Sequence, residues 1–213
     1  MTFADQADVL INTRLAADIM GATKMDRPEW GAVHPDTGEV YFTLTNNTGR
    51  TTTDAANPRP NNTTGHIIRW REIANNPRGF NWDIFLLGGD VGTTTGSGSN
   101  AVALTAENHF ASPDGLLIDT RGVAWIQTDM SGSQQSDGPF GNNQMLAADP
   151  VTKEVKRFFV GPVDAEVTGV TLTPDLKTMF VNIQHPGENS KSATDPTKFT
   201  SHWPDGGDAR PRS

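Results

Sequence analysis

Hydrophobic positions along most of this 213-residue chain alternate with polar positions over short stretches, and turn-forming residues separate the stretches. Such alternation is typical of β-strands that bury one face. The alternating stretches come in pairs around a turn, at residues 30–45, 66–87, 115–129, 144–160 and 167–184. The pattern therefore predicts an all-β fold. Near the N-terminus, residues 7–20 space their apolar side chains for a helix instead, so we expect one short helix there.

The strand pairs repeat along the chain. Residues 115–129 and 167–184 follow the pattern of 30–45, and residues 144–160 follow that of 66–87. Two successive hairpins form a four-stranded meander, and meanders repeated around an axis are the blades of a β-propeller. The aromatic residues of these strands are expected in the core of the blades: Trp30, Trp82, Trp125 and Phe180. A β-sandwich of similar strand content is the alternative.

The number of blades limits what this chain can form alone. About two and a half blades can be recognised, whereas propellers close with about four to eight. We therefore expect residues 1–213 to be a single β-propeller part-domain of a longer protein, with a polar surface tail over 185–213. An open blade edge can pair with another strand, which favours a homo-oligomer.

The amino-acid composition argues against several kinds of binding partner and site. A net charge of −8 argues against a nucleic-acid partner, which would require a basic face. The chain has no cysteine, so disulfides and thiolate metal sites are excluded. No apolar run approaches the roughly 18 residues of a membrane span, so we expect no membrane insertion. The first residues lack the basic start and apolar centre of a signal peptide, which places any export signal upstream of this chain.

A carboxylate stands at the start of each hairpin of the first type: Glu29, Asp114 and Glu166. In a propeller these starts converge on the central channel, so the three side chains would meet at one end of it. Converging carboxylates repel one another unless a cation neutralises them, and oxygen ligands suit hard cations such as calcium. The alternative is that each acid is a solvated turn residue, above all Asp114 within Pro-Asp-Gly.

The stretch KMDRPEW, residues 24–30, adds an arginine to this group. Pro28 predicts an extended conformation for Arg27, because a proline disfavours the helical region for the residue before it. Alternate residues of an extended chain face the same side, so Arg27 and Glu29 should point together and Asp26 away from them. A guanidinium beside a metal-binding carboxylate suits a phosphate that bridges the two. A solvated Arg–Glu surface pair is the alternative.

Four segments together carry a resemblance to a known family: DRPEWGAVHPDTGEVYFTLTNN (26–47), PDGLLIDTRGVAWIQTD (113–129), EVTGVTLTPDLKTMFVNIQHPGE (166–188) and SHWPDGG (201–207). The chain resembles the C-terminal portion of PhoX-type alkaline phosphatases. The resemblance implies a β-propeller that holds Ca2+ and Fe3+ and hydrolyses phosphomonoesters, in the periplasm or secreted after export. It also implies that the family's cysteine ligand to iron, which this chain lacks, belongs to the N-terminal half.

The resemblance assigns roles to individual residues. Arg27 and Glu29 are the expected catalytic pair, with Arg27 contacting the substrate phosphate and Glu29 binding metal. Asp114 and Glu166 match the family's other acidic metal ligands, and Arg157 is a candidate second phosphate contact. The chain would thus supply part of a phosphatase site and be inactive alone. Two alternatives remain: a calcium-dependent propeller lactonase or esterase, and a non-catalytic binding module whose acids staple blades through calcium.

Overall fold

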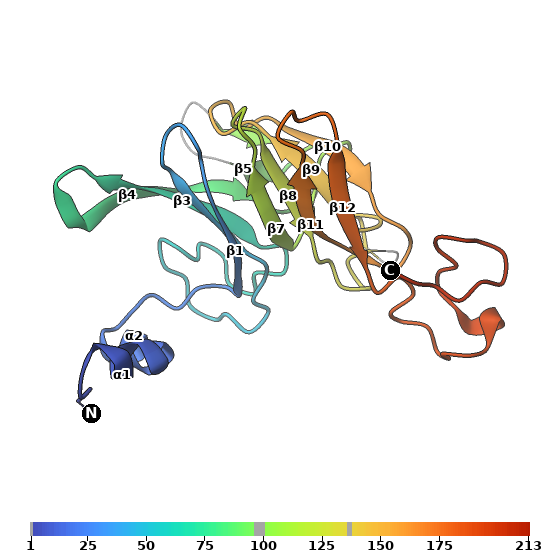
Figure 1. The fold of residues 1–213 in the computed structure, drawn as a ribbon, viewed down its shortest axis with the longest axis horizontal. Coiled ribbons are helices and arrows are strands. Elements are labelled where there is room, and N and C mark those ends of the chain that lie inside the picture. The colour runs from blue at the N-terminus through green and yellow to red at the C-terminus, as the bar shows by residue number, and fades with distance from the viewer. Residues whose placement is uncertain (1, 96–100, 136–137) are drawn as a thin grey trace.

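The structure, a computed structural model, describes residues 2–95, 101–135 and 138–213. It confirms the all-β fold. Two short helices, α1 (Gln6–Ile11) and α2 (Thr13–Ile19), precede the strands (Figure 1). The sequence pattern predicted one helix over 7–20, but the helix is interrupted at Asn12. Neither helix buries a residue, and Leu10, Ile11 and Met20 are largely exposed.

The strands pair in chain order, as meanders do. The first four-stranded antiparallel sheet contains β1 (Pro28–Val33), β2 (Val40–Leu44), β3 (His66–Ile73) and β4 (Asn76–Leu87). The second contains β7 (Pro113–Ile118), β8 (Ala124–Thr128), β9 (Gln144–Ala148) and β10 (Val155–Val160). A hairpin follows, made of β11 (Glu166–Leu172) and β12 (Met179–Gln184). Between the two large sheets lies a short pair, β5 (Thr94–Thr95) and β6 (Val102–Ala103).

The first strands of the three units lie next to one another, since β7 contacts both β1 and β11 (Figure 1). The main core fills the space between the two large sheets, with Tyr41, Phe85 and Ile126 fully buried in it. A second core packs Trp125, Met145 and Val167 between the second sheet and the hairpin. Because β1, β7 and β11 adjoin, their starts come together at one end of the sheets.

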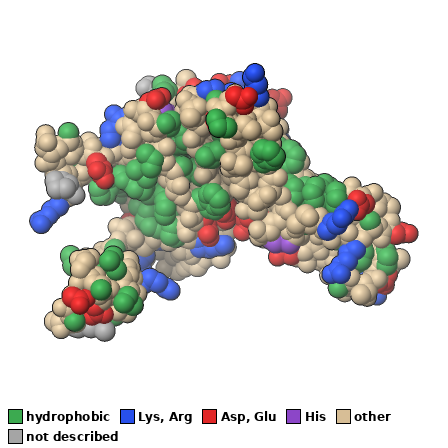
Figure 2. All heavy atoms as spheres, in the orientation of Figure 1, with side chains coloured by type: hydrophobic (Ala, Val, Ile, Leu, Met, Phe, Trp, Pro, Cys, Tyr) green, Lys and Arg blue, Asp and Glu red, His purple; other side chains and the backbone are tan. Residues whose placement is uncertain are grey.

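Three of the four aromatic residues expected in the core are exposed. Trp125 is buried as predicted, but Trp30, Trp82 and Phe180 are 42%, 41% and 60% exposed. The alternating pattern predicts which face of a strand is apolar, but it does not show what packs on that face. Within the described residues, no further sheet packs on the outer faces of the first sheet and of the hairpin. Figure 2 shows hydrophobic side chains gathered on the surface over β1 and β3.

The C-terminal segment extends away from the sheets beyond β12 and carries a short 3-10 helix, Pro196–Lys198 (Figure 1). Strand β4 begins at Asn76, after a two-residue turn at Ala74–Asn75, and the register between β3 and β4 shifts next to this turn. Among the described residues, no helix is long and apolar enough to cross a membrane.

Candidate active site

The three units begin with the same backbone geometry. In each, a non-glycine residue with positive φ lies two residues before the acid: Arg27 (φ 51°) before Glu29, Ser112 (φ 52°) before Asp114 and Asp164 (φ 54°) before Glu166. Each of these strands, β1, β7 and β11, also contains a register shift. Left-handed non-glycine residues and β-bulges are both unfavourable features that concentrate at functional sites, where they redirect side chains. Each of the three acids therefore follows a left-handed residue at the start of its strand.

The predicted extended conformation of Arg27 is wrong, because its φ lies in the left-handed region. Its main chain is fixed on both sides: the Thr45 N–H donates to the Arg27 carbonyl at 3.0 Å, and the preceding Asp26 is fully buried. The consequence drawn from the extended chain nevertheless holds. The Arg27 Nη2 lies 3.5 Å from Glu29 Oε1, while Asp26 points into the protein. Arg27 Nη1 also donates to Asn46 Oδ1 at 3.1 Å.

The acids act on one another electrostatically. Burial, together with the negative charges of Glu29, Glu166 and Asp129, raises the pKa of the half-buried Asp114 to about 7. Burial and the charge of Asp129 also raise the pKa of Glu166. Because such effects require proximity, Asp114 lies close enough to Glu29 and to Glu166 for their charges to act on it.

Four further residues belong to this region. Asp129 directly follows β8 and acts on both Asp114 and Glu166. His185 Nε2 lies 3.4 Å from Glu166 Oε2, the oxygen that also accepts a hydrogen bond from Gln184 at 2.9 Å. Asp129 and Gln184 carried no sequence signal beyond their place at a strand end, opposite the start of the first strand. Their roles depend on strand register, which the alternating pattern does not specify.

The fully buried Gln127 is the fourth of these residues. Neither polar atom of its side chain has a hydrogen-bond partner among the described residues. Its Oε1 lies 2.4 Å from the position that a Cβ of Gly115 would occupy, so the amide fills the space beside the residue after Asp114. Buried polar atoms without partners are rare and call for a ligand or water. An amide oxygen near carboxylates is a donor that a hard cation accepts.

The donor set fits a hard cation in chemistry but not yet in spacing. Across residues 2–95, 101–135 and 138–213, no three His, Asp or Glu side chains lie close enough to hold one ion together. Glu29 and Glu166 therefore act on the charge of Asp114, but the three acids do not lie close enough together to share one ion. A full coordination sphere requires additional ligands. The thiolate implied for iron cannot come from this chain, which has no cysteine.

Comparison with known proteins identifies the family of this chain. The family described as "Alkaline phosphatase PhoX" matches residues 1–187. The chain belongs to the PhoX alkaline phosphatase family. It is also similar to a solved structure, Pseudomonas fluorescens PhoX in complex with vanadate, a transition state analogue, at 50% identity and a TM-score of 0.77. That match covers 90% of this chain and 34% of that chain, so the chain spans about a third of its relative's length. No curated protein matches it.

In this PhoX family chain, Arg157 is engaged by protein groups. Its Nε donates to Gln144 Oε1, and its Nη2 donates to the His109 carbonyl at 3.1 Å. Its Nη1 donates to the Ala106 carbonyl at 3.4 Å. These bonds tie the loop before β7 to β10. A second phosphate contact from Arg157 stays a prediction.

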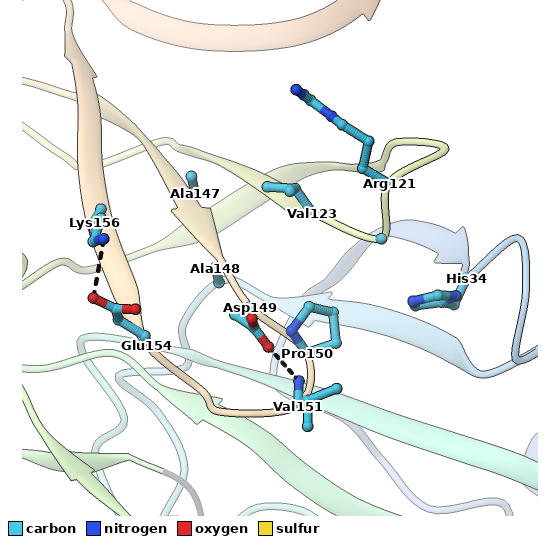
Figure 3. A pocket seen from close by; sticks show the side chains of 11 residues that line it. His34, Arg121, Val123, Ala147, Ala148, Asp149, Pro150, Val151, Glu154 and Lys156 are labelled. Atoms are coloured by element: carbon cyan, nitrogen blue, oxygen red, sulfur yellow. Dashed lines mark hydrogen bonds and ion pairs between the residues drawn. The ribbon is translucent and has the colours of Figure 1, made fainter.

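A surface pocket lies at the other end of the sheets, where the turns after β1, β7 and β9 meet (Figure 3). Its charged groups are paired: Lys156 Nζ lies 3.1 Å from Glu154 Oε1, and Asp149 accepts the N–H of Val151 at 2.7 Å. None of the predicted site residues lines this pocket. Its location therefore separates it from the acids at the strand starts.

Proposed function

We propose that this chain is the C-terminal part of an exported PhoX-type alkaline phosphatase and supplies part of its phosphomonoester site. The observation that carries the proposal is the guanidinium of Arg27, 3.5 Å from Glu29 and near Asp114, whose pKa is raised to about 7 by burial and by the neighbouring carboxylates. Family membership and the similarity to a vanadate-bound PhoX support the same site class.

In the proposed site, the positively charged residue of this chain would bind the phosphoryl group and the negatively charged residues would bind cations. Arg27 would donate its planar N–H groups to the phosphoryl oxygens, which bear increasing negative charge in the transition state. Glu29, Asp114 and Glu166 would bind the cations, Ca2+ and Fe3+ by resemblance to the family. When bound, these ions neutralise charge on the phosphoryl group. Further ligands would come from outside this chain.

The longer protein would complete both the fold and the site. We propose that the two meanders and the hairpin are blades of a β-propeller, and that the exposed aromatic faces of the first sheet and the hairpin pack on adjacent blades. A chain holding only part of the metal sites is expected to be inactive alone. We place the complete enzyme in the periplasm or outside the cell. Association of two copies through open strand edges remains a proposal for the isolated chain.

Replacing Arg27 by Lys tests the phosphate site. The variant is expected to bind vanadate or inorganic phosphate about 10- to 100-fold more weakly in the presence of calcium, because a lysine cannot form the paired, planar contacts of a guanidinium. Isothermal titration calorimetry on the chain measures the change. Arg121→Lys is the matched control, since Arg121 is also half-exposed and carboxylate-paired but lies at the other end of the sheets.

Equal affinity in the wild type and the Arg27→Lys variant would contradict the proposal. That outcome is what a calcium-stapled module or a lactonase-type site predicts, since neither requires an arginine beside the acids.

A further inference from the structure

A buried carboxylate lies directly before the proposed phosphate-binding arginine. Asp26 is 0% exposed. Its Oδ1 accepts hydrogen bonds from Asn47 Nδ2 at 3.0 Å and from Arg50 Nε, and its Oδ2 accepts one from Asn62 Nδ2 at 2.9 Å. Burial opposes the charge on Asp26, yet these three donors lower the pKa of the carboxyl below its ordinary value. Asp26 is thus a fully paired interior anion.

The donors come from the polar loop over 45–65, which closes around the segment before β1. Arg50, whose side chain is only 10% exposed, also donates Nη2 to the Lys24 carbonyl at 2.6 Å. Asn57 donates to the same carbonyl at 3.0 Å. Asn62 is held in turn by His66 Nδ1 at 3.1 Å. The loop therefore clamps the main chain immediately before Arg27.

The equivalent residues of the other two units show why Arg27 needs such a clamp. Ser112 and Asp164 have the same left-handed φ, and their own side chains hold them in place. Ser112 Oγ donates to Gln134 at 3.0 Å, and the Asp164 carboxylate accepts the N–H of Asn189 at 2.8 Å. The Arg27 side chain is bonded to Asn46 and Glu29 through its guanidinium, the group proposed to bind phosphate. Contacts of the preceding Asp26 can hold the strained conformation without occupying that group.

We infer that Asp26 is a positioning residue for Arg27: its clasp by Asn47, Arg50 and Asn62 holds Arg27 in the left-handed conformation that directs the guanidinium to Glu29. The role of the clasp in ligand binding rests on the proposed function, whereas its control of the Arg27 backbone does not. The Asp26→Asn change keeps the size of the side chain but removes the charge that pairs with Arg50 and one of the acceptors.

Two measurements on the chain test the inference. In Asp26→Asn, NMR of residue 27 is expected to lose the strong intraresidue N–H to Hα cross-peak of a left-handed residue, and vanadate affinity is expected to fall about 10- to 100-fold. Asp119→Asn is the matched control, because it also neutralises a buried carboxylate paired with an arginine, Arg121, but lies away from Arg27. It is expected to leave both readouts unchanged.

A double-mutant cycle separates positioning from general destabilisation. If Asp26 acts through Arg27, adding Asp26→Asn to an Arg27→Ala chain has no further effect on vanadate affinity. Additive losses in the cycle, or an unchanged left-handed signal in Asp26→Asn, would overturn the inference. If that variant does not fold, Asn47→Ala removes one donor to the carboxylate and is expected to shift the same signal partially; no shift would also overturn it. If Arg27→Ala leaves the vanadate affinity unchanged, that result contradicts the proposed function but not the inference about Asp26. The NMR signal of residue 27 still tests the inference.

Discussion

Replacing Asp83 by Asn is expected to destabilise the chain by about 3–5 kcal/mol, the cost of leaving buried charges without their partner. Asp83 receives two hydrogen bonds from Arg69, at 2.9 and 2.8 Å, and one from Lys153 Nζ at 3.0 Å. The Lys153 side chain is only 2% exposed. It lies in the turn between β9 and β10, whereas Asp83 lies in β4, so the cluster joins the two large sheets.

The Asp83 prediction is checked by urea unfolding, with Lys153→Met as the matched variant. Met fills a similar volume and leaves the Arg69–Asp83 pair intact, so its loss should stay below about 1.5 kcal/mol. Burial opposes the charge of Asp83, but Arg69 and Lys153 lower the pKa of its carboxyl below 3.8. The contribution of Asp83 is therefore complete above pH 3.8 and is lost as the pH falls through its folded pKa. Equal losses in the two variants would show that the carboxylate is not the centre of the cluster.

The ion cluster illustrates what the sequence could not predict. Lys153 and Asp83 are separated by 70 positions, and neither position is distinctive in its local pattern. The strand pairs, in contrast, were predictable because alternation and turns are local features that adjacent residues determine. The aromatic positions lie between these cases. The pattern predicted Trp30 and Trp82 to lie in the core, but it could not show that no further sheet covers them within the described residues.

The candidate site also combines residues that the sequence could predict with features that it could not. Glu29, Asp114 and Glu166 could be aligned from the repeat, since equivalent positions in repeated units occupy equivalent places in the fold. The conformation of Arg27 could not, because the local rule for a residue before proline favours an extended chain and distant contacts override it. The loop over 45–65 has no periodicity, so nothing in it indicated that its Asn and Arg side chains close on Asp26.

Calcium is expected to stabilise the chain more strongly as the pH rises through 7, and this response should depend on Asp114. Burial and the neighbouring acids raise the pKa of Asp114 from 3.8 to about 7. Without calcium, the folded chain keeps a proton that the unfolded chain releases, so the free energy of unfolding falls between pH 3.8 and about 7. A cation reverses this trend, because it binds the ionised carboxylate and removes the repulsion that opposed ionisation.

Thermal unfolding at pH 6 and pH 8, with and without calcium, measures this linkage. At about 100 times its dissociation constant, calcium should contribute about 2.7 kcal/mol, a rise in midpoint of about 5–10 °C. Asp114→Asn should raise the midpoint of the calcium-free chain at pH 8 and abolish the calcium response. Asp175→Asn, which alters a fully exposed carboxylate, should preserve that response. A wild-type midpoint indifferent to calcium, with an Asp114→Asn chain no more stable than the wild type, would mean that these acids are separately solvated and hold no cation in this chain.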